Sequence, residues 1–87
     1  MKYLLFWEYD PKDEPTLFEK FKVLPEDYKK LRIFPPHFLG GQTKGFSVLE
    51  ADDFEQIEQF CHHYAPDMKW KIFPIIEAAK AVQIREK

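Results

Sequence analysis

Three side chains in this sequence could act as a general base: Glu8, His37 and Glu50. The two glutamates lie near the ends of apolar segments. A carboxylate held in an apolar cleft has a raised pKa, which suits it to proton transfer near neutral pH. His37 is included because the other two histidines are expected on the outside of a helix. The alternative is that both glutamates simply reach solvent at strand ends.

Three large aromatic side chains are candidates for the wall of a ligand cleft: Trp7, Tyr9 and Trp70. Apolar and aromatic side chains form most of the lining of small-molecule sites, so the ligand would be small and apolar. A place in the core or in a subunit interface is the competing interpretation of the same residues.

The run Cys61-His62-His63-Tyr64 contains residue types that bind metals. Ligands on one helix need a spacing of three or four residues, whereas adjacent residues diverge by about 100°. We therefore predict no metal site and no cofactor. Cys61 falls on the apolar side of the expected helix, so we expect it to be a small core residue rather than a nucleophile.

The segment KGFSVLE (44–50) shares its first three residues with the third-strand signature of RNA-recognition domains. Val48 and Ala51 stand in place of the further aromatic residues, so two of the three base-stacking positions are missing. A net charge of −2 provides no general attraction for nucleic acid. Binding of RNA is accordingly the third of the functions considered.

The chain is expected to form one domain, residues 1–87, because this length leaves no room for a second core. Hydrophobic residues make up 45% of it and aromatic residues 17%, a large apolar load for so small a core. This predicts an exposed apolar patch and self-association. The longest apolar run, residues 4–7, is too short to span a membrane, and a single cysteine favours a reducing, cytoplasmic location.

The elements that must position these residues follow from hydrophobic spacing and from the prolines. Residues 2–9 predict a strand. The next segment has an apolar residue every three or four positions, as on one face of a helix: Leu17, Phe21, Leu24, Tyr28 and Leu31. Pro25 divides this helix into two pieces. Its start is either Thr16, in a capping box, or Asp13.

The second half of the chain predicts two strands, a helix and one more strand, followed by a helical tail. Pro35-Pro36 restrict the strand before the glycine-rich turn to an irregular sheet edge. Residues 45–51 predict a proline-free strand, after which Asp52 begins a helix. A further proline makes the last strand an edge as well, and residues 77–86 predict the terminal helix.

These elements run β-α-β-β-α-β, which is the ferredoxin-like order of an α+β domain. The antiparallel sheet of that fold has the order 4-1-3-2, with both helices on one face. Its first and third strands are central, and in this chain only these two lack proline. The prolines and the element order therefore predict the same sheet.

The first strand is apolar on both of its faces. Residues 3, 5, 7 and 9 point one way and residues 4, 6 and 8 the other, with Glu8 the only charged residue among them. An antiparallel sheet with one face in water should instead alternate apolar and polar residues. We therefore predict that a second copy covers the face without helices, across a two-fold axis.

Three segments carry a resemblance to a known family: MKYLLFWEY, GFSVLEADDFEQIEQF and WKIFPIIE. They resemble an uncharacterised family of small bacterial and archaeal proteins, a domain of unknown function in the dimeric α+β barrel superfamily. The resemblance spans most of the chain and implies a ferredoxin-like protomer whose bare sheet face packs on a partner. The superfamily includes cofactor-independent monooxygenases, isomerases, haem-degrading enzymes and ligand-sensing modules, so the fold does not select a function.

Two main functions remain open. The first is a structural or binding module without assigned activity that forms a homodimer through its sheet face. The second is a cofactor-independent enzyme of monooxygenase or isomerase type, or a small-molecule binder, that uses the cleft between sheet and helices. An enzyme of this kind predicts Glu8, His37 or Glu50 inside a pocket, whereas a structural module predicts all three in water.

Overall fold

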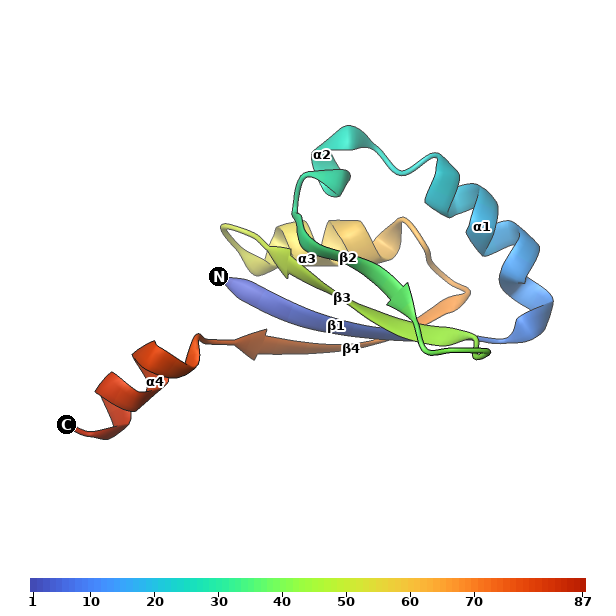
Figure 1. Ribbon diagram of the computed structural model, residues 1–87. Coiled ribbons are helices and arrows are strands. Elements are labelled where there is room, and N and C mark those ends of the chain that lie inside the picture. The colour runs from blue at the N-terminus through green and yellow to red at the C-terminus, as the bar shows by residue number, and fades with distance from the viewer.

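The computed structural model describes residues 1–87 and contains a sheet with helices on one side and a helix that projects from its end (Figure 1). The elements are β1 (Lys2–Tyr9), a 3-10 turn η1 (Pro11–Asp13), α1 (Glu14–Lys22), α2 (Glu26–Lys29), β2 (Arg32–Phe38), β3 (Lys44–Glu50), α3 (Phe54–His62), β4 (Met68–Ile75) and α4 (Ala78–Arg85). The strands are antiparallel in the order β2-β3-β1-β4. This confirms the predicted order 4-1-3-2 and the ferredoxin-like fold.

Helices α1, α2 and α3 lie over one face of the sheet, and the opposite face is open (Figure 1). The alternate residues of β1 that begin with Tyr3 and end with Tyr9 are buried beneath the helices. On the opposite face Phe6 is exposed over 40% of its surface. The structure thus decides which face of β1 meets the helices, a question that the apolar pattern on both faces leaves open.

The prolines act as predicted, because β2 and β4 are the two edges of the sheet. The pairing of β2 with β3 shifts register on both sides of Phe34, next to Pro35-Pro36. Proline has no N–H to donate to a ladder, so regular pairing cannot continue through these residues. The resulting irregular edge strand carries Arg32 at its start and Phe38 at its end, and both face the helix layer.

The first helical region is divided before Pro25, as predicted, and Leu24 is buried in the break between α1 and α2. Asp13, the N-cap of α1, is the correct start, and the alternative start at Thr16 is wrong. Pro15 explains this, since proline is well accommodated in the first turn of a helix. Phe21 belongs to the predicted apolar stripe but remains 48% exposed.

Helix α3 begins one residue later than predicted, with Asp53 rather than Asp52 as its N-cap. The Asp53 side chain accepts a hydrogen bond from the backbone N–H of Gln56 at 3.1 Å. The Gln56 side chain in turn accepts one from the backbone N–H of Asp52 at 2.8 Å. The two bonds resemble a capping box, except that Gln56 accepts from the residue before the N-cap, and they satisfy two backbone donors at the start of the helix. Ile57, Phe60 and Cys61 of this helix are buried, whereas Phe54 at its start remains 50% exposed.

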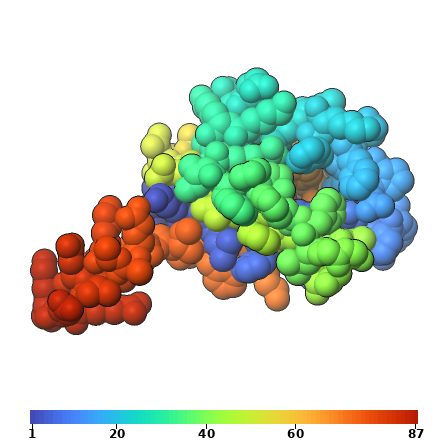
Figure 2. All heavy atoms as spheres, viewed as in Figure 1, coloured from blue at the N-terminus to red at the C-terminus, as the bar shows by residue number.

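Helix α4 stands apart from the rest of the chain and buries none of its residues (Figure 2). The segment before it is attached to the sheet by an ion pair of 2.9 Å between Lys2 Nζ and Glu77 Oε1. With this projection the molecule measures 50 × 28 × 18 Å. None of the helices has the length and apolar character that crossing a bilayer requires.

Candidate functional site

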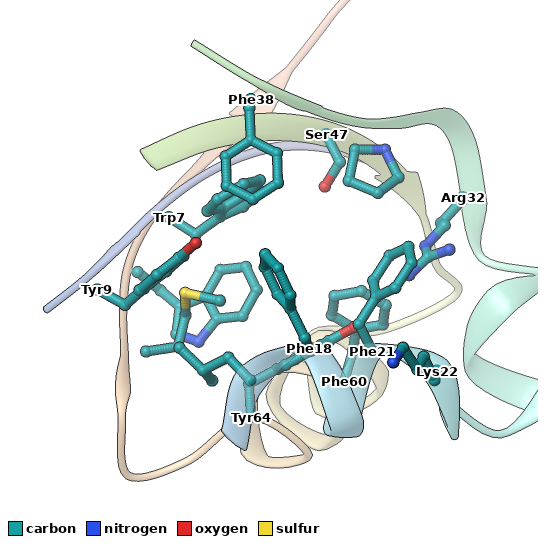
Figure 3. Close-up of a pocket in the computed structure, with 14 residues that line it drawn as sticks. Trp7, Tyr9, Phe18, Phe21, Lys22, Arg32, Phe38, Ser47, Phe60 and Tyr64 are labelled. Carbon is teal, nitrogen blue, oxygen red and sulfur yellow. The ribbon is translucent and has the colours of Figure 1, made fainter. Parts of the chain in front are cut away.

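A cavity of about 370 Å³ lies between the helix-bearing face of the sheet and α1 (Figure 3). Eight of its 14 lining residues are aromatic: Trp7, Tyr9, Phe18, Phe21, Phe38, Phe60, Tyr64 and Trp70. Leu17, Pro36 and Met68 extend the apolar wall, and Lys22, Arg32 and Ser47 are its polar members. In the space-filling view a hollow opens between the α1 and β2 segments (Figure 2).

The helix-facing side of β3 carries two small residues near the cavity: Ser47, which lines it, and Gly45, which is covered by Trp7. The indole of Trp7 lies against Gly45, so closely that an added Cβ would be 2.6 Å from the ring. Ser47 is almost completely buried, and its hydroxyl points into the cavity (Figure 3). A larger side chain at Ser47 would extend into the space between the sheet and α1.

Helix α1 forms the roof of the cavity and contributes Phe18 and Phe21 to it (Figure 3). Leu17 is its only buried residue. Little apolar area therefore ties this helix to the sheet, and hydrogen bonds near its two ends hold it instead.

At the start of α1 the Tyr9 hydroxyl donates to Glu14 Oε1 at 2.8 Å. Near its end Lys20 Nζ donates to the Ala65 carbonyl at 2.8 Å, and His63 Nε2 lies 2.7 Å from the Lys20 carbonyl oxygen. A carbonyl oxygen only accepts, so this Nε2 carries a proton. His63 is thus half-buried against α1 rather than free on the outside of α3.

Two N–H groups among the lining residues are buried without a hydrogen-bond partner, Arg32 Nε and Trp70 Nε1. The Arg32 guanidinium lies 5.3 Å from the centre of the Phe21 ring and 5.9 Å from that of Phe60. Buried polar groups in proteins are normally paired, so each exception calls for an explanation.

Burial changes the protonation of several groups in and near the cavity. Burial and the hydrogen bond to Glu14 raise the pKa of Tyr9 to about 12. Burial also raises the pKa of Tyr64, and the nearby Arg32 guanidinium offsets part of this. Burial and the charge of Glu58 raise the pKa of the Cys61 thiol to about 12, so this side chain stays protonated at neutral pH. Cys61 is buried, in agreement with the core role expected for it.

The structure brings Trp7, Tyr9 and Trp70 together in the wall of this cavity. None of the three candidate bases lines it. Glu8 is exposed and lines a second, more open hollow of about 580 Å³ on the open sheet face, and Glu50 is exposed at the end of β3.

His37 is also exposed, with its ring 4.8 Å from the Phe34 ring and its Nδ1 2.7 Å from the Pro35 carbonyl oxygen. No group of three histidine, cysteine, aspartate or glutamate side chains is placed to hold a metal ion.

Sequence reasoning missed the three polar residues of the cavity: Ser47, Lys22 and Arg32. Lys22 had no signal, since a lysine in the last turn of a helix is normally solvated. Ser47 had a visible signal, because it is a polar residue between Gly45 and Leu49 on one face of a central strand. Arg32 had none, since an arginine at the start of an edge strand is normally solvated. Only the fold shows that α1 and α3 enclose it.

Comparisons with known proteins agree with the fold. The solved structures include one titled "Crystal structure of antibiotic biosynthesis monooxygenase", with a TM-score of 0.55 and 10% sequence identity over 88% of this chain and 100% of that chain. At this identity the likeness concerns the fold alone. No curated protein has a matching sequence. A family model matches residues 1–87, which confirms the resemblance seen in the sequence: the chain belongs to the family described as "Domain of unknown function (DUF3303)".

Proposed function

We propose that this protein binds a small apolar molecule in the cavity between its sheet and α1. The cavity itself carries the proposal, since its volume of about 370 Å³ suits a ligand of one or two rings. Ligand sites are typically lined by aromatic and apolar side chains with a few polar groups, and this wall has that composition.

The groups on the wall favour binding over catalysis. A base that removes a proton from a substrate must lie within hydrogen-bond reach of it, and the wall contains no aspartate, glutamate or histidine. The Tyr9 hydroxyl is already committed to Glu14. The proposal is therefore a binding module, and an oxygenase or isomerase reaction is not part of it.

The two tryptophans of the chain provide the test, because both Trp7 and Trp70 line the cavity. A ¹H–¹⁵N spectrum contains one indole cross-peak for each, and we expect both to shift saturably when 2-naphthamide is added. Ser47→Phe should abolish the shifts by filling the cavity, whereas Ser47→Ala should preserve them. Cross-peaks that do not move, or that move equally in a folded Ser47→Phe variant, would contradict the proposal.

We further propose that the protein forms a homodimer through its open sheet face. This face carries a contiguous apolar patch: Leu4, Phe6, Phe34, Phe46, Val48, Phe73 and Ile75. Its rings lie close together, with the Phe34 and Phe46 centroids 5.8 Å apart. Glu8 pairs in register with Lys44 on one side and Lys69 on the other, and Lys71 lies beside Phe6 on the same face. A patch that carries both charges beside its apolar centre suits a second copy of itself.

The solution mass across a range of concentrations tests this proposal. We expect twice the chain mass of 10.5 kDa for the natural sequence. Phe6→Glu, at the centre of the patch, should yield monomers. Val23→Glu, an equally drastic change at an exposed position between α1 and α2, should leave the dimer intact. A natural protein that is monomeric throughout would overturn the proposal, and binding of single-stranded RNA to that monomer would assign the face to nucleic acid.

A further inference from the structure

The proposed binding function does not specify the class of ligand. The polar groups of the cavity indicate which functional group the ligand carries. Resting on that function, we infer that the ligand is an apolar carboxylic acid whose carboxylate pairs with Arg32. The argument starts from the charge on the wall. Lys22 and Arg32 line the cavity, and no acidic residue does.

Arg32 is partly enclosed and yet has no ionic partner. Five lysines of the chain lie within 4.0 Å of a carboxylate oxygen, whereas Arg32 does not, although its Nε is shielded from water. Shielding a charge from water is unfavourable unless the charge is paired. The rings of Phe21 and Phe60 stabilise the guanidinium in part, and the Tyr64 hydroxyl beside it supplies a neutral oxygen. None of these groups carries the negative charge that would pair with the guanidinium.

A ligand carboxylate would complete this arrangement. Guanidinium groups bind carboxylates through parallel N–H···O bonds, and these charge-assisted bonds are about twice as strong as neutral ones. The unpartnered Nε1–H of Trp70 is a second donor in the same cavity, which again favours a ligand with oxygen acceptors. The aromatic wall then suits a planar, apolar body for the remainder of the molecule.

A matched pair of ligands separates this inference from the proposed function. 2-Naphthoate and 2-naphthamide have the same shape and differ in charge. We expect the natural protein to bind the naphthoate about tenfold more tightly, which corresponds to about 1.4 kcal/mol. Arg32→Met should remove this preference and leave the affinity for the amide unchanged. Arg85→Met is the matched control, because Arg85 lies on the projecting α4 and does not line the cavity, and the preference should change less than twofold.

An NMR measurement can observe Arg32 directly and so supplements the affinities. The chain has two arginines, Arg32 and Arg85, and therefore two arginine Nε–H cross-peaks. The Nε–H cross-peak of Arg32 should shift with naphthoate and not with naphthamide, while that of the exposed Arg85 stays in place. This measurement uses the natural protein, so it decides the matter even where Arg32→Met does not fold. Equal binding of both ligands, with an unmoved Arg32 signal, would overturn the carboxylate inference and leave the binding function standing. Binding of neither ligand would refute both.

Discussion

Replacement of Gly45 by alanine tests how closely Trp7, a residue of the cavity wall, packs on β3. The added Cβ would lie 2.6 Å from Cζ2 and 2.7 Å from Cη2 of the Trp7 indole, and it would also meet the backbone carbonyl oxygen of His37. Carbon atoms in contact are normally about 3.5–4.0 Å apart. The indole must therefore move by about 1 Å, away from β3 and into the cavity that it lines.

The cost follows from the rigidity of these neighbours. Overpacking costs about 1–3 kcal/mol, and the upper half of this range applies because one of the obstructing atoms belongs to the backbone. Alanine lowers the conformational entropy of the unfolded chain relative to glycine. This stabilises the folded state by about 0.4–1 kcal/mol and offsets part of the cost. We expect Gly45→Ala to lower the free energy of unfolding by about 1–2.5 kcal/mol, with a fall in Tm of about 4–8 °C for each kcal/mol.

Urea unfolding followed by circular dichroism measures this change, and Gly40→Ala is the matched control. A Cβ at Gly40 meets no atom within 4 Å, and the φ of this residue is not positive, so its stability should change by less than about 0.5 kcal/mol. Gly45→Ala should also shift the indole cross-peak of Trp7 and weaken the binding of 2-naphthamide. Equal stabilities of the two variants, with an unmoved Trp7 cross-peak, would refute the reasoning.

Three further predictions concern the roof of the cavity, the pH dependence and the tail. Tyr9→Phe removes the hydrogen bond to Glu14 and should lower the free energy of urea unfolding by about 1 kcal/mol, whereas an unchanged value would mean that this bond does not hold α1. The folded pKa values of Tyr9 and Cys61, both about 12, exceed their ordinary values of 10.0 and 9.0. These raised pKa values mean that protonated Tyr9 and Cys61 favour the folded state. Their contribution to stability is fully present below about pH 9 and is lost as the pH rises toward 12. Urea midpoints measured from pH 8 to 11 should fall, and a rise would contradict this sign. Truncation after Glu77 removes α4, which buries nothing, and should change the stability of the protomer by less than about 0.5 kcal/mol. A larger loss at low protein concentration would contradict this.

The candidate bases on the strands lie on the sheet face opposite the cavity. Glu8 and Glu50 alternate along their strands with buried residues, so they face away from the helices and the cavity. Trp7 and Tyr9 occupy the opposite phase of β1 and reach the cavity. The two sets of candidates in the sequence thus lie on different faces of one sheet, and only the aromatic set shares a cavity.

Several features of the fold were readable from local chemistry. The order of strands and helices followed from apolar spacing, and the edges of the sheet followed from prolines that lack an N–H donor. Pro25 predicted the break between α1 and α2, because a proline restricts the residue before it as well as itself. Such features depend on neighbours in the chain, so the sequence by itself determined them.

The cavity and the choice of buried face were decided only by the tertiary structure. A strand that is apolar on both sides has no periodic signal to say which side meets the helices. The contact of Trp7 with Gly45 depends on the register of two strands, and the enclosure of Arg32 depends on where Phe21 of α1 and Phe60 of α3 come to lie. These residues are far apart in the chain, and only the packing of the helices on the sheet brings them together.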